Sequence, residues 1–582
     1  MCGIIGYMGE EAALPIIIEG LQKLEYRGYD SFGFAIENDL HIQTQKFIGS
    51  ITENKSLISN ITGNTGIGHT RWATHGPVCK KNAHPHLSSN KKFIIVHNGI
   101  IENFEEIKSN LNKKGFEFYG DTDTEVIAKL IEEKYNQCQN VKQAIQQSLD
   151  LIKGAYAIAV VNEINPNNIF LACKDAPLKL GISDTGIYFA SDPIGFLRHT
   201  NQVITLEDND FVEINNKTYT ITNNGEVIQR NINNIEWQQK TAEKNDFNHF
   251  MLKEIHEQSK NLKNVFQNSN TTINNIKQLL KNARRVLIIG CGTAYHAGLV
   301  LKNKLLSKGI IAESIIASEF EQYKTLTKDD VIVTFSQSGE TADLLEVLKN
   351  IKKEKKCKVI TITNVVQSTI TRFSDEVIYL NQGPEIGVAS TKAYTGMIAA
   401  IELLICENPL DFQTQIIKQQ EIIAQIISKQ KKQLKIISEK LVAAQDIYLI
   451  GRGKNLVTAL EGALKIKEIS YIHSEGMAAG ELKHGTLALI EKGVPVIVIA
   501  PTDEKFAETI SNALEIKSRG GKIIGISDKP NNAFDEFIEI PKTKFQEITT
   551  IIPLQMIAYN LAIKKGFNPD KPRNLAKSVT VK

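Results

Sequence analysis

The chain has 582 residues, 42% of them hydrophobic and 23% charged, which is the ordinary balance of a globular protein. A chain of this length is expected to hold about three or four domains. Because 68 basic residues nearly balance 65 acidic ones, the composition argues against a nucleic-acid or membrane partner. The seven cysteines are scattered singly and no apolar run approaches the ~18 residues of a membrane span, so we expect a cytoplasmic protein.

The first 215 residues predict an α+β domain in which helices cover stacked antiparallel sheets. Short β-rich runs separated by turn residues lie at 32–37, 92–97, 156–161, 168–173 and 186–191. Helical patterns lie between them at 14–26 and 123–135. A polar, Asn-rich stretch follows, so we assign residues 2–215 to this domain and 216–274 to a connector.

Beyond about residue 275, strand and helix patterns alternate, and the whole pattern occurs twice. Residues 285–292 (RVLIIGCG) are echoed by 446–453 (DIYLIGRG), and 358–363 (KVITIT) are echoed by 522–527 (KIIGIS). The separation is nearly the same for both pairs of segments. This repetition predicts two tandem α/β domains, each with a doubly wound parallel sheet.

The join between the two repeats is rich in Lys and Gln and carries isoleucine pairs at helical spacing. That spacing predicts a docked amphipathic helix and not a flexible linker. The resulting boundaries are 275–413 for the first repeat, 414–431 for the linking helix, 432–573 for the second repeat and 574–582 for a carboxy-terminal tail.

A cysteine stands directly after the initiator methionine. If Met1 is removed, Cys2 carries both a thiol and a free α-amine, whose pKa near ~8 lets it act as a base at neutral pH. That pairing is the chemistry of an N-terminal nucleophile. The alternative is a small apolar residue that opens a buried strand, and this alternative is favoured when Cys2 is considered alone.

Several polar clusters of the first domain also have structural alternatives. Asn98-Gly99 lies between two apolar runs and is compatible with a hairpin turn. Asp121 to Glu125 is compatible with a capped helix start. Five histidines lie between residues 69 and 97, but no pair has ligand spacing on one helix face, so no zinc site is predicted.

Taken together, these clusters form an ordered set of six motifs: CGIIG, LEYRGYDS, HTRWATHG, NAHPH, VHNGIIEN and TDTE. The set resembles the glutaminase domain of the class II, or N-terminal nucleophile, amidotransferases. The resemblance implies an αββα fold in which Cys2 attacks the side-chain amide of glutamine and forms a thioester. It also implies that the Asn98 side chain and the Gly99 N–H line the oxyanion hole.

The same resemblance assigns roles around the bound glutamine. Arg71 would hold its carboxylate, Asp123 would hold its α-ammonium group, and Trp72 would cover the released ammonia. No metal is implied. Phe32 stands where the family usually carries a small residue, so local packing is expected to differ there.

In the first repeat, an apolar strand ends in Ser336-Gln-Ser-Gly-Glu-Thr341, and a helical pattern follows. Hydroxyl groups and free N–H groups at a helix start form an anion site, although a capped helix start is the simpler alternative. The position after the carboxyl end of a strand favours a ligand site. The second repeat has Asp503 and Glu504 at the equivalent turn, where they would repel a phosphate, so one phosphate site is predicted.

The second repeat carries Glu461, Lys465 and Glu468 on one face of a predicted helix. This spacing is compatible with a surface ion pair or with an acid–base row that faces a pocket. His484 follows in a loop between glycines, where a catalytic imidazole is often found.

The segments CGTAYHAG, SQSGETAD, EIGVASTKAY, EGALKIKEISYIH, AAGELKHG and RNLAKSVTV resemble the paired sugar-isomerase (SIS) domains of the glutamine–fructose-6-phosphate aminotransferase family. The resemblance implies phosphate contacts from Ser336, Gln337, Ser338 and Thr341, and further sugar contacts from Thr293, Val388, Ser390 and Ala576. Two positions depart from the family pattern, Ala294 in place of a serine and Thr486 in place of a proline.

Catalytic roles in the isomerase half follow from the same resemblance. Glu468 would move the proton between C1 and C2 of the sugar, with Glu461 and Lys465 in support. His484 would assist ring opening, and Lys577 would meet the C2 carbonyl. A His484 supplied by a neighbouring subunit would require a homodimer.

The expected activity is therefore the synthesis of glucosamine 6-phosphate from glutamine and fructose 6-phosphate, without a cofactor or metal. Two alternatives remain open from the sequence. One is an enzyme acting on another sugar phosphate or in the deglycase direction. The other is a regulator that binds a sugar phosphate without turnover.

Overall fold

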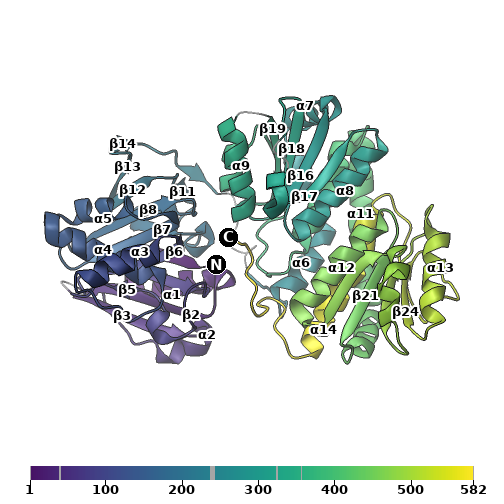
Figure 1. Ribbon diagram of the computed structural model, residues 1–582, viewed down its shortest axis with the longest axis horizontal. Coiled ribbons are helices and arrows are strands. Elements are labelled where there is room, and N and C mark those ends of the chain that lie inside the picture. Colours follow the sequence, from purple (N-terminus) through teal and green to yellow (C-terminus); the bar gives the residue numbers. More distant parts are fainter. Residues whose placement is uncertain (1, 39–40, 236–242, 323–324, 355–356, 581–582) are drawn as a thin grey trace. The chain divides into compact units, whose positions relative to one another are not determined.

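The computed structural model describes residues 2–38, 41–235, 243–322, 325–354 and 357–580 (Figure 1). These residues form two compact units, one made of the chain up to residue 241 together with residues from 576 onward, the other of residues 242–575. Residues 236–242 of the predicted connector lie outside the described residues. Within the described part of the chain, no helix is both long and apolar enough to cross a membrane.

The first unit contains two sheets whose strands pair antiparallel. Among the described residues one sheet runs in the order β15 (Asn233–Asn234), β11 (Gln202–Thr205), β9 (Lys179–Ile182), β10 (Gly186–Ala190), β1 (Gly3–Gly9), β4 (Thr65–Arg71), β2 (Ser31–Asn38) and β3 (His41–Ile48). The other runs in the order β14 (Glu226–Ile228), β13 (Thr218–Asn223), β12 (Asp210–Asn215), β8 (Asn168–Lys174), β7 (Gly154–Asn162), β6 (Phe93–Ile101) and β5 (His86–Leu87).

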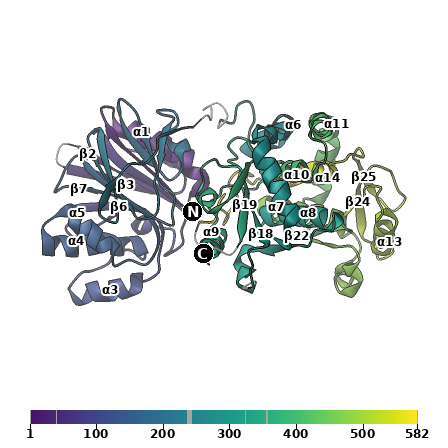
Figure 2. The ribbon, with the colours of Figure 1, turned by 90° about the horizontal axis from the view of Figure 1, so that it is seen from above.

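The two sheets stack face to face, and helices cover the outer face of each. This unit has one apolar core between the sheets and another between the second sheet and its helices. Alternate residues of β6 belong to each: Ile94 and Val96 face the other sheet, whereas Phe93 and Ile95 pack against helices. Those helices are α3 (Phe104–Lys113), α4 (Asp123–Cys138) and α5 (Val141–Leu149), and α1 (Ala13–Leu24) covers the first sheet. Figure 2 shows the layers from α1 at the top to α3 at the bottom, which confirms the predicted αββα fold.

Strands β13 and β14 form a hairpin at the edge of the second sheet, where the sequence predicted a connector beginning at residue 216. Asn224 and Gly225 make the turn with φ angles of 51° and 87°. Positive φ at both central residues suits the right-handed twist of paired strands. Strand β14 is too short to show an apolar pattern, whereas β13 alternates threonines with Tyr219 and Ile221 and buries Ile221.

The second unit contains two parallel sheets with the same strand order, which confirms the predicted tandem repeat. Within the described residues the first runs β17 (Ala312–Ile316), β16 (Arg285–Gly290), β18 (Asp330–Ser336), β19 (Lys358–Thr363) and β20 (Glu376–Tyr379). The second runs β22 (His473–Ala478), β21 (Asp446–Gly451), β23 (Pro495–Ile499), β24 (Lys522–Ser527) and β25 (Glu536–Glu539).

One continuous apolar core joins the two repeats. The helices of this unit are α6 (Phe250–Asn261), α7 (Asn270–Asn282), α8 (Thr293–Ser307), α9 (Ala342–Glu354), α10 (Lys392–Ile405), α11 (Pro409–Leu441), α12 (Asn455–Ser470), α13 (Phe506–Lys517) and α14 (Gln546–Lys564). Helix α11 contains the predicted linking segment and buries Ile416, Ile423 and Ile437 in this core, so it is docked along its length.

Candidate active site

Cys2 lies at the start of β1, beside the end of β4. The register pairs Gly3 with Thr70, which brings Cys2 next to Arg71 and Trp72. The backbone N–H of Trp72 donates to Cys2 Sγ over 3.3 Å, and the Cys2 thiol donates to the Trp72 carbonyl over 3.5 Å. Pairing with Trp72 therefore fixes the thiol where β1 begins and β4 ends.

Burial raises the pKa of the Cys2 thiol, while the Trp72 N–H and the Arg71 charge act in the opposite direction. A thiol with a raised pKa needs a base before it can attack a carbon. The free α-amine of a processed chain is the base that the sequence predicts. Met1, on whose removal that amine depends, lies outside the described residues.

Arg71 and Asp123 are buried and are held in place by backbone groups. The guanidinium of Arg71 donates to the carbonyls of Gly76 (3.2 Å) and Pro77 (3.3 Å). The carboxylate of Asp123 accepts from the Ile101 N–H over 2.9 Å, so it ties the first turn of α4 to β6. Burial lowers the pKa of Arg71, and the charges of Cys2 and Asp123 oppose that shift, so the three groups interact in one place.

Asn98 and Gly99 lie inside β6 and not in a hairpin turn, which excludes the turn alternative. Gly99 has a φ of 130°, and a Cβ there would lie 1.9 Å from the Ala155 carbonyl oxygen on β7. Only glycine tolerates this backbone and this close approach. The strand that passes the predicted oxyanion hole therefore has a local shape that depends on Gly99.

Four buried histidines form a network that joins β4, β6 and the first turn of α4. His69 stacks on His84 with ring centroids 3.8 Å apart, and His84 meets His86 edge to face. His69 Nε2 lies 2.9 Å from the His97 carbonyl, and His97 Nδ1 lies 2.9 Å from Thr124 Oγ1. In the described part of the chain, no group of three or more His, Cys, Asp and Glu side chains is arranged to hold a metal ion.

The residues of this histidine network are neighbours in sequence of the predicted glutamine-site residues. His97 precedes Asn98, His69 lies on β4 two residues before Arg71, and Thr124 follows Asp123. The network therefore connects the strands and the helix that carry the predicted site residues.

The histidine network predicts a loss of stability in acid. Burial lowers the pKa of His69 to about 3 and also lowers the pKa values of His84, His86 and His97. An unfolded histidine titrates near ~6.5, so below that pH the unfolded chain binds more protons than the folded one. The stability that these neutral rings provide is complete above pH ~6.5 and is lost as the pH falls towards 3, by about 1.4 kcal/mol per pH unit for each histidine that stays neutral.

Thermal unfolding of the full chain between pH 7.5 and 4.5 measures this effect. The transition of the first unit is expected to shift downwards by several degrees, and His69→Gln should flatten the shift. His473→Gln is the matched control, because the His473 side chain is 65% exposed. A pH-independent transition in the unmodified chain would contradict the prediction.

The predicted phosphate loop is closed by its own hydroxyl groups. Ser336 Oγ accepts from the Gly339 N–H over 2.9 Å and lies 3.2 Å from Thr341 Oγ1, while Ser338 Oγ accepts from the Glu340 N–H over 3.2 Å. Helix α9 begins directly after this loop. Hydroxyl groups and a helix start therefore gather at the carboxyl end of β18, an arrangement that suits an anion.

The second repeat has a carboxylate of its own at the equivalent turn. Asp503 Oδ2 accepts from Asn455 Nδ2 over 2.9 Å, and Asp503 Oδ1 accepts from the Lys505 N–H over 2.9 Å. An internal carboxylate thus uses donors that a bound phosphate would need. The two repeats thus differ at this turn, and a single phosphate site in the first repeat stays a prediction.

The predicted acid–base row of Glu461, Lys465 and Glu468 lies on α12. It is largely buried and is not a surface ion pair. Lys465 Nζ lies 2.7 Å from Glu468 Oε2 and 3.4 Å from Glu461 Oε1, and the side chains of Lys465 and Glu461 are fully buried. Thr293 on α8 accepts from Lys465 Nζ over 3.0 Å and donates to Glu461 Oε1 over 3.1 Å. Burial alone would lower the pKa of Lys465, but Glu461 and Glu468 more than compensate and raise it. The row therefore joins helices of both repeats.

Two further residues of this site were not singled out from the sequence. His296 Nδ1 lies 2.7 Å from Glu461 Oε2. The sequence feature that points to His296 is its position three residues after Thr293, which places both side chains on one face of α8. Glu385 accepts from Ser390 Oγ (2.8 Å) and from two backbone N–H groups, so it shapes the loop of Val388 and Ser390.

Not all predicted isomerase residues join this row. His484 is exposed in a short 3-10 helix, Glu481–His484. Ala576 and Lys577 lie in the irregular tail, which groups with the first unit. Their contacts with a sugar stay predictions.

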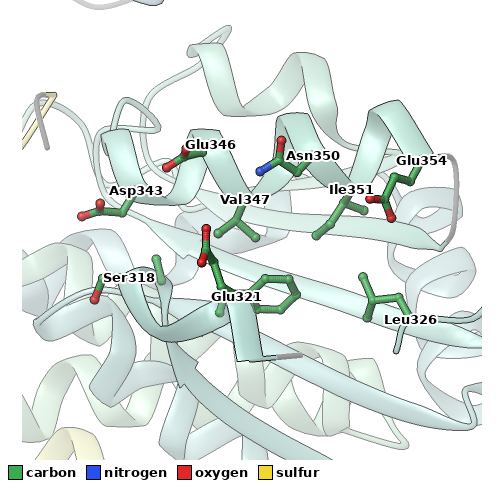
Figure 3. Close-up of a pocket in the computed structure, with 11 residues that line it drawn as sticks. Ser318, Glu321, Leu326, Asp343, Glu346, Val347, Asn350, Ile351 and Glu354 are labelled. Carbon is green, nitrogen blue, oxygen red and sulfur yellow. The ribbon is translucent and has the colours of Figure 1, made fainter. Parts of the chain in front are cut away.

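A cavity of about 550 Å³ lies in the first repeat, between the 3-10 helix Ala317–Gln322 and α9 (Figure 3). Apolar side chains such as Phe320, Val347 and Ile351 line it, together with carboxylates such as Glu346 and Glu354. None of the predicted sugar-phosphate residues lines it. The carboxylates that line it repel a phosphate, so this cavity is not the predicted phosphate site.

Departures from the family pattern are accommodated locally. Phe32 is buried on β2, and its ring stacks on the ring of Phe47 with centroids 4.9 Å apart. This contact accommodates the larger side chain. Ala294 is buried at the first turn of α8, beside the bonded Thr293.

Comparisons with known proteins agree with both halves of the chain. Residues 54–250 match the glutamine amidotransferase domain family, and residues 279–406 and 440–565 each match the SIS domain family. The chain is 44% identical to a glutamine–fructose-6-phosphate aminotransferase [isomerizing] of Pyrococcus horikoshii and 42% identical to one of Clostridium tetani, with full coverage of both chains in each case. The C-terminal domain of glucosamine-fructose-6-phosphate aminotransferase from Francisella tularensis matches 57% of this chain and all of its own, with 33% identity and a TM-score of 0.52.

An αββα glutamine amidotransferase domain followed by two SIS domains defines the class of enzyme to which the chain belongs. The similarity to the relatives above extends over the full length of this chain and identifies one family within this class. The chain belongs to the glutamine–fructose-6-phosphate aminotransferase (isomerizing) family.

Proposed function

We propose that the chain makes glucosamine 6-phosphate from fructose 6-phosphate, with the side-chain amide of glutamine as the nitrogen source. The observation that carries this proposal is the buried Glu461–Lys465–Glu468 row, bonded to Thr293 of the other repeat, in a chain that also carries the Cys2 site. The names of the full-length relatives support the same reaction.

In the first half-reaction, the Cys2 thiol gives its proton to the α-amine and attacks the amide carbon of glutamine. A thioester forms, ammonia leaves, and water then releases glutamate. The Asn98 side chain and the Gly99 N–H would each stabilise the oxyanion by ~3–4 kcal/mol. Arg71 would bind the glutamine carboxylate, because its bonds to backbone carbonyls fix the guanidinium without using all five N–H donors.

Two further groups complete the glutamine site in this proposal. Asp123 would bind the α-ammonium group, since its carboxylate is held by β6 close to Arg71. Trp72, whose ring meets Tyr29 edge to face, would cover the released ammonia. Ammonia that stayed out of bulk water would remain unprotonated and nucleophilic.

In the second half-reaction, ammonia adds to C2 of open-chain fructose 6-phosphate and water leaves, which gives an imine. Glu468 would then take a proton from C1 and return it to C2. Glu461 is the less suitable base, because Thr293 and His296 already occupy both of its oxygens. The Glu468 side chain is 20% exposed, so a substrate can reach it.

The remaining sugar contacts follow the family pattern. Ser336, Gln337, Ser338 and Thr341 would hold the phosphate, with Val388 and Ser390 on the sugar. Lys577 would meet the C2 carbonyl, beside Ala576. His484 would assist ring opening and, being exposed on its own subunit, would act at the site of a second copy in a homodimer. We expect this homodimer to be cytoplasmic and to need neither a membrane nor a nucleic acid.

Product analysis tests the proposal. Amide-labelled glutamine and fructose 6-phosphate should give glucosamine 6-phosphate that carries the label, with one glutamate per product molecule. Activity with only another sugar phosphate, or a net reaction in the deglycase direction, would replace the proposed reaction by those alternatives. Tight sugar-phosphate binding without turnover would indicate a regulator.

A further inference from the structure

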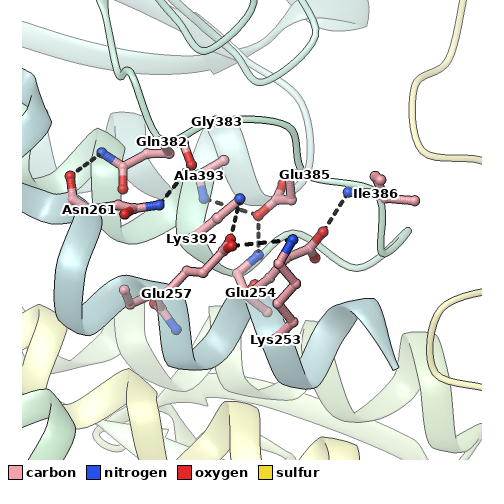
Figure 4. Close-up of polar contacts among 12 residues, drawn as sticks. Lys253, Glu254, Glu257, Asn261, Gln382, Gly383, Glu385, Ile386, Lys392 and Ala393 are labelled. Atoms are coloured by element: carbon pink, nitrogen blue, oxygen red, sulfur yellow. Dashed lines mark hydrogen bonds and ion pairs between the residues drawn. The ribbon is translucent and has the colours of Figure 1, made fainter. Parts of the chain in front are cut away.

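Helix α6 is bonded to the loop of residues 380–391, between β20 and α10, which carries the proposed sugar contact Val388 (Figure 4). Glu254 on α6 accepts hydrogen bonds from the backbone N–H groups of Ile386 (2.5 Å) and Gly387 (3.2 Å). Both donors lie immediately before Val388. A helix carboxylate thus fixes the backbone of the sugar loop on one side.

Further bonds tie the start of this loop, and the residue that directly follows the loop, to the same helix. Lys392 Nζ lies 2.6 Å from Glu257 Oε2, and the Lys392 side chain is buried. At the other end, Asn261 Nδ2 donates to the Gln382 carbonyl (3.0 Å) and Gln382 Nε2 donates to the Asn261 carbonyl (3.1 Å). The position of the loop therefore follows the position of α6.

The start of α6 is fixed by Asp570, which lies more than 300 residues further along the chain. Its two carboxylate oxygens accept from the N–H groups of Phe250 and Met251, each over 2.8 Å. His249, at the cap position itself, offers no side-chain cap. The backbone carbonyl of Asp570 in turn accepts from the Val388 N–H over 3.3 Å. Asp570 is 4% exposed and thus touches both the helix start and the sugar loop.

We propose that Asp570 is a positioning residue for the binding of fructose 6-phosphate, a role that rests on the proposed function. Its charge lies at the positive end of α6 and satisfies the first two N–H groups of that helix. Since α6 holds the sugar loop through Glu254, and Asp570 holds Val388 directly, the loop is fixed from two directions by one capping group. Asp570 also stands shortly before Ala576 and Lys577, so it fixes the point from which the tail leaves the domain.

The variant Asp570→Asn separates positioning from folding. Asparagine keeps one acceptor oxygen but turns an amide N–H towards the second backbone donor, so one cap bond is lost with little change in volume. We expect the dissociation constant for fructose 6-phosphate, measured by calorimetry on the full chain, to rise about five- to tenfold. Glutamine hydrolysis without sugar should stay at the level of the unmodified chain.

Asp446→Asn is the matched control, because Asp446 lies on a strand of the same unit and pairs with the exposed His473. Unchanged fructose 6-phosphate affinity in Asp570→Asn, or an equal loss in Asp446→Asn, would overturn the proposal. If Asp570→Asn does not fold, Glu254→Gln decides: weakened sugar binding supports the proposal, and unchanged binding overturns it. An unmodified chain that makes no glucosamine 6-phosphate is a separate result, which overturns the proposed function itself.

Discussion

Replacement of Cys2 by alanine is expected to lower glutamine-dependent synthesis of glucosamine 6-phosphate by at least about a thousandfold, because no second nucleophile replaces the thiol. The bonds of Cys2 to Trp72 and its proximity to Arg71 place that thiol at the predicted glutamine site. Synthesis with added ammonium salt should survive, since ammonia then reaches the sugar without the first half-reaction. Both rates are measured from the formation of glucosamine 6-phosphate.

Cys79→Ala is the matched control for this variant. Cys79 lies partly buried on the loop after Trp72. Its replacement should leave glutamine-dependent synthesis close to that of the unmodified chain. Glutamine-dependent synthesis that persisted in Cys2→Ala would contradict the nucleophile assignment, whereas loss of the ammonia-dependent rate would show that the substitution damaged more than the first site.

The architecture was readable from the sequence wherever burial leaves a periodic pattern. Strands β16 and β21 are buried on both faces of parallel sheets, so they read as apolar runs, and their repetition gave the tandem folds. Strand β14 has three exposed or half-buried residues at the sheet edge, so burial leaves no periodic pattern there, whereas β13 alternates threonines with Tyr219 and Ile221, which pack on the core. The alternation in β13 and the Asn224-Gly225 turn are the two local signals that predict this hairpin.

The candidate site was only partly readable, because its groups come together over long distances in the sequence. Helical spacing placed Glu461, Lys465 and Glu468 on one face, but it could not decide whether that face was exposed. Burial of the row depends on Thr293 and His296, which belong to the other repeat. No pattern within α12 encodes contacts with α8, so the choice between a surface pair and a buried row required the fold.

Replacement of Glu468 by glutamine is expected to remove the proton transfer of the second half-reaction and to leave the first intact. Glutamine has nearly the same shape and can still accept the hydrogen bond from Lys465. It cannot take a proton from C1, so synthesis should fall by about 10²- to 10⁴-fold, the range that general-base catalysis contributes. Glutamine hydrolysis, measured as glutamate release, should change little.

Two further variants test whether the loss of activity comes from the role of Glu468 as the base. Glu475→Gln changes an exposed glutamate of the same repeat and should leave synthesis unaltered. Glu461→Gln should act differently, because Glu461 is buried between Thr293, Lys465 and His296, and its loss disturbs the row and lowers stability as well as activity. A Glu468→Gln enzyme that still made glucosamine 6-phosphate at the unmodified rate would contradict the assignment of Glu468 and move the base to another member of the row.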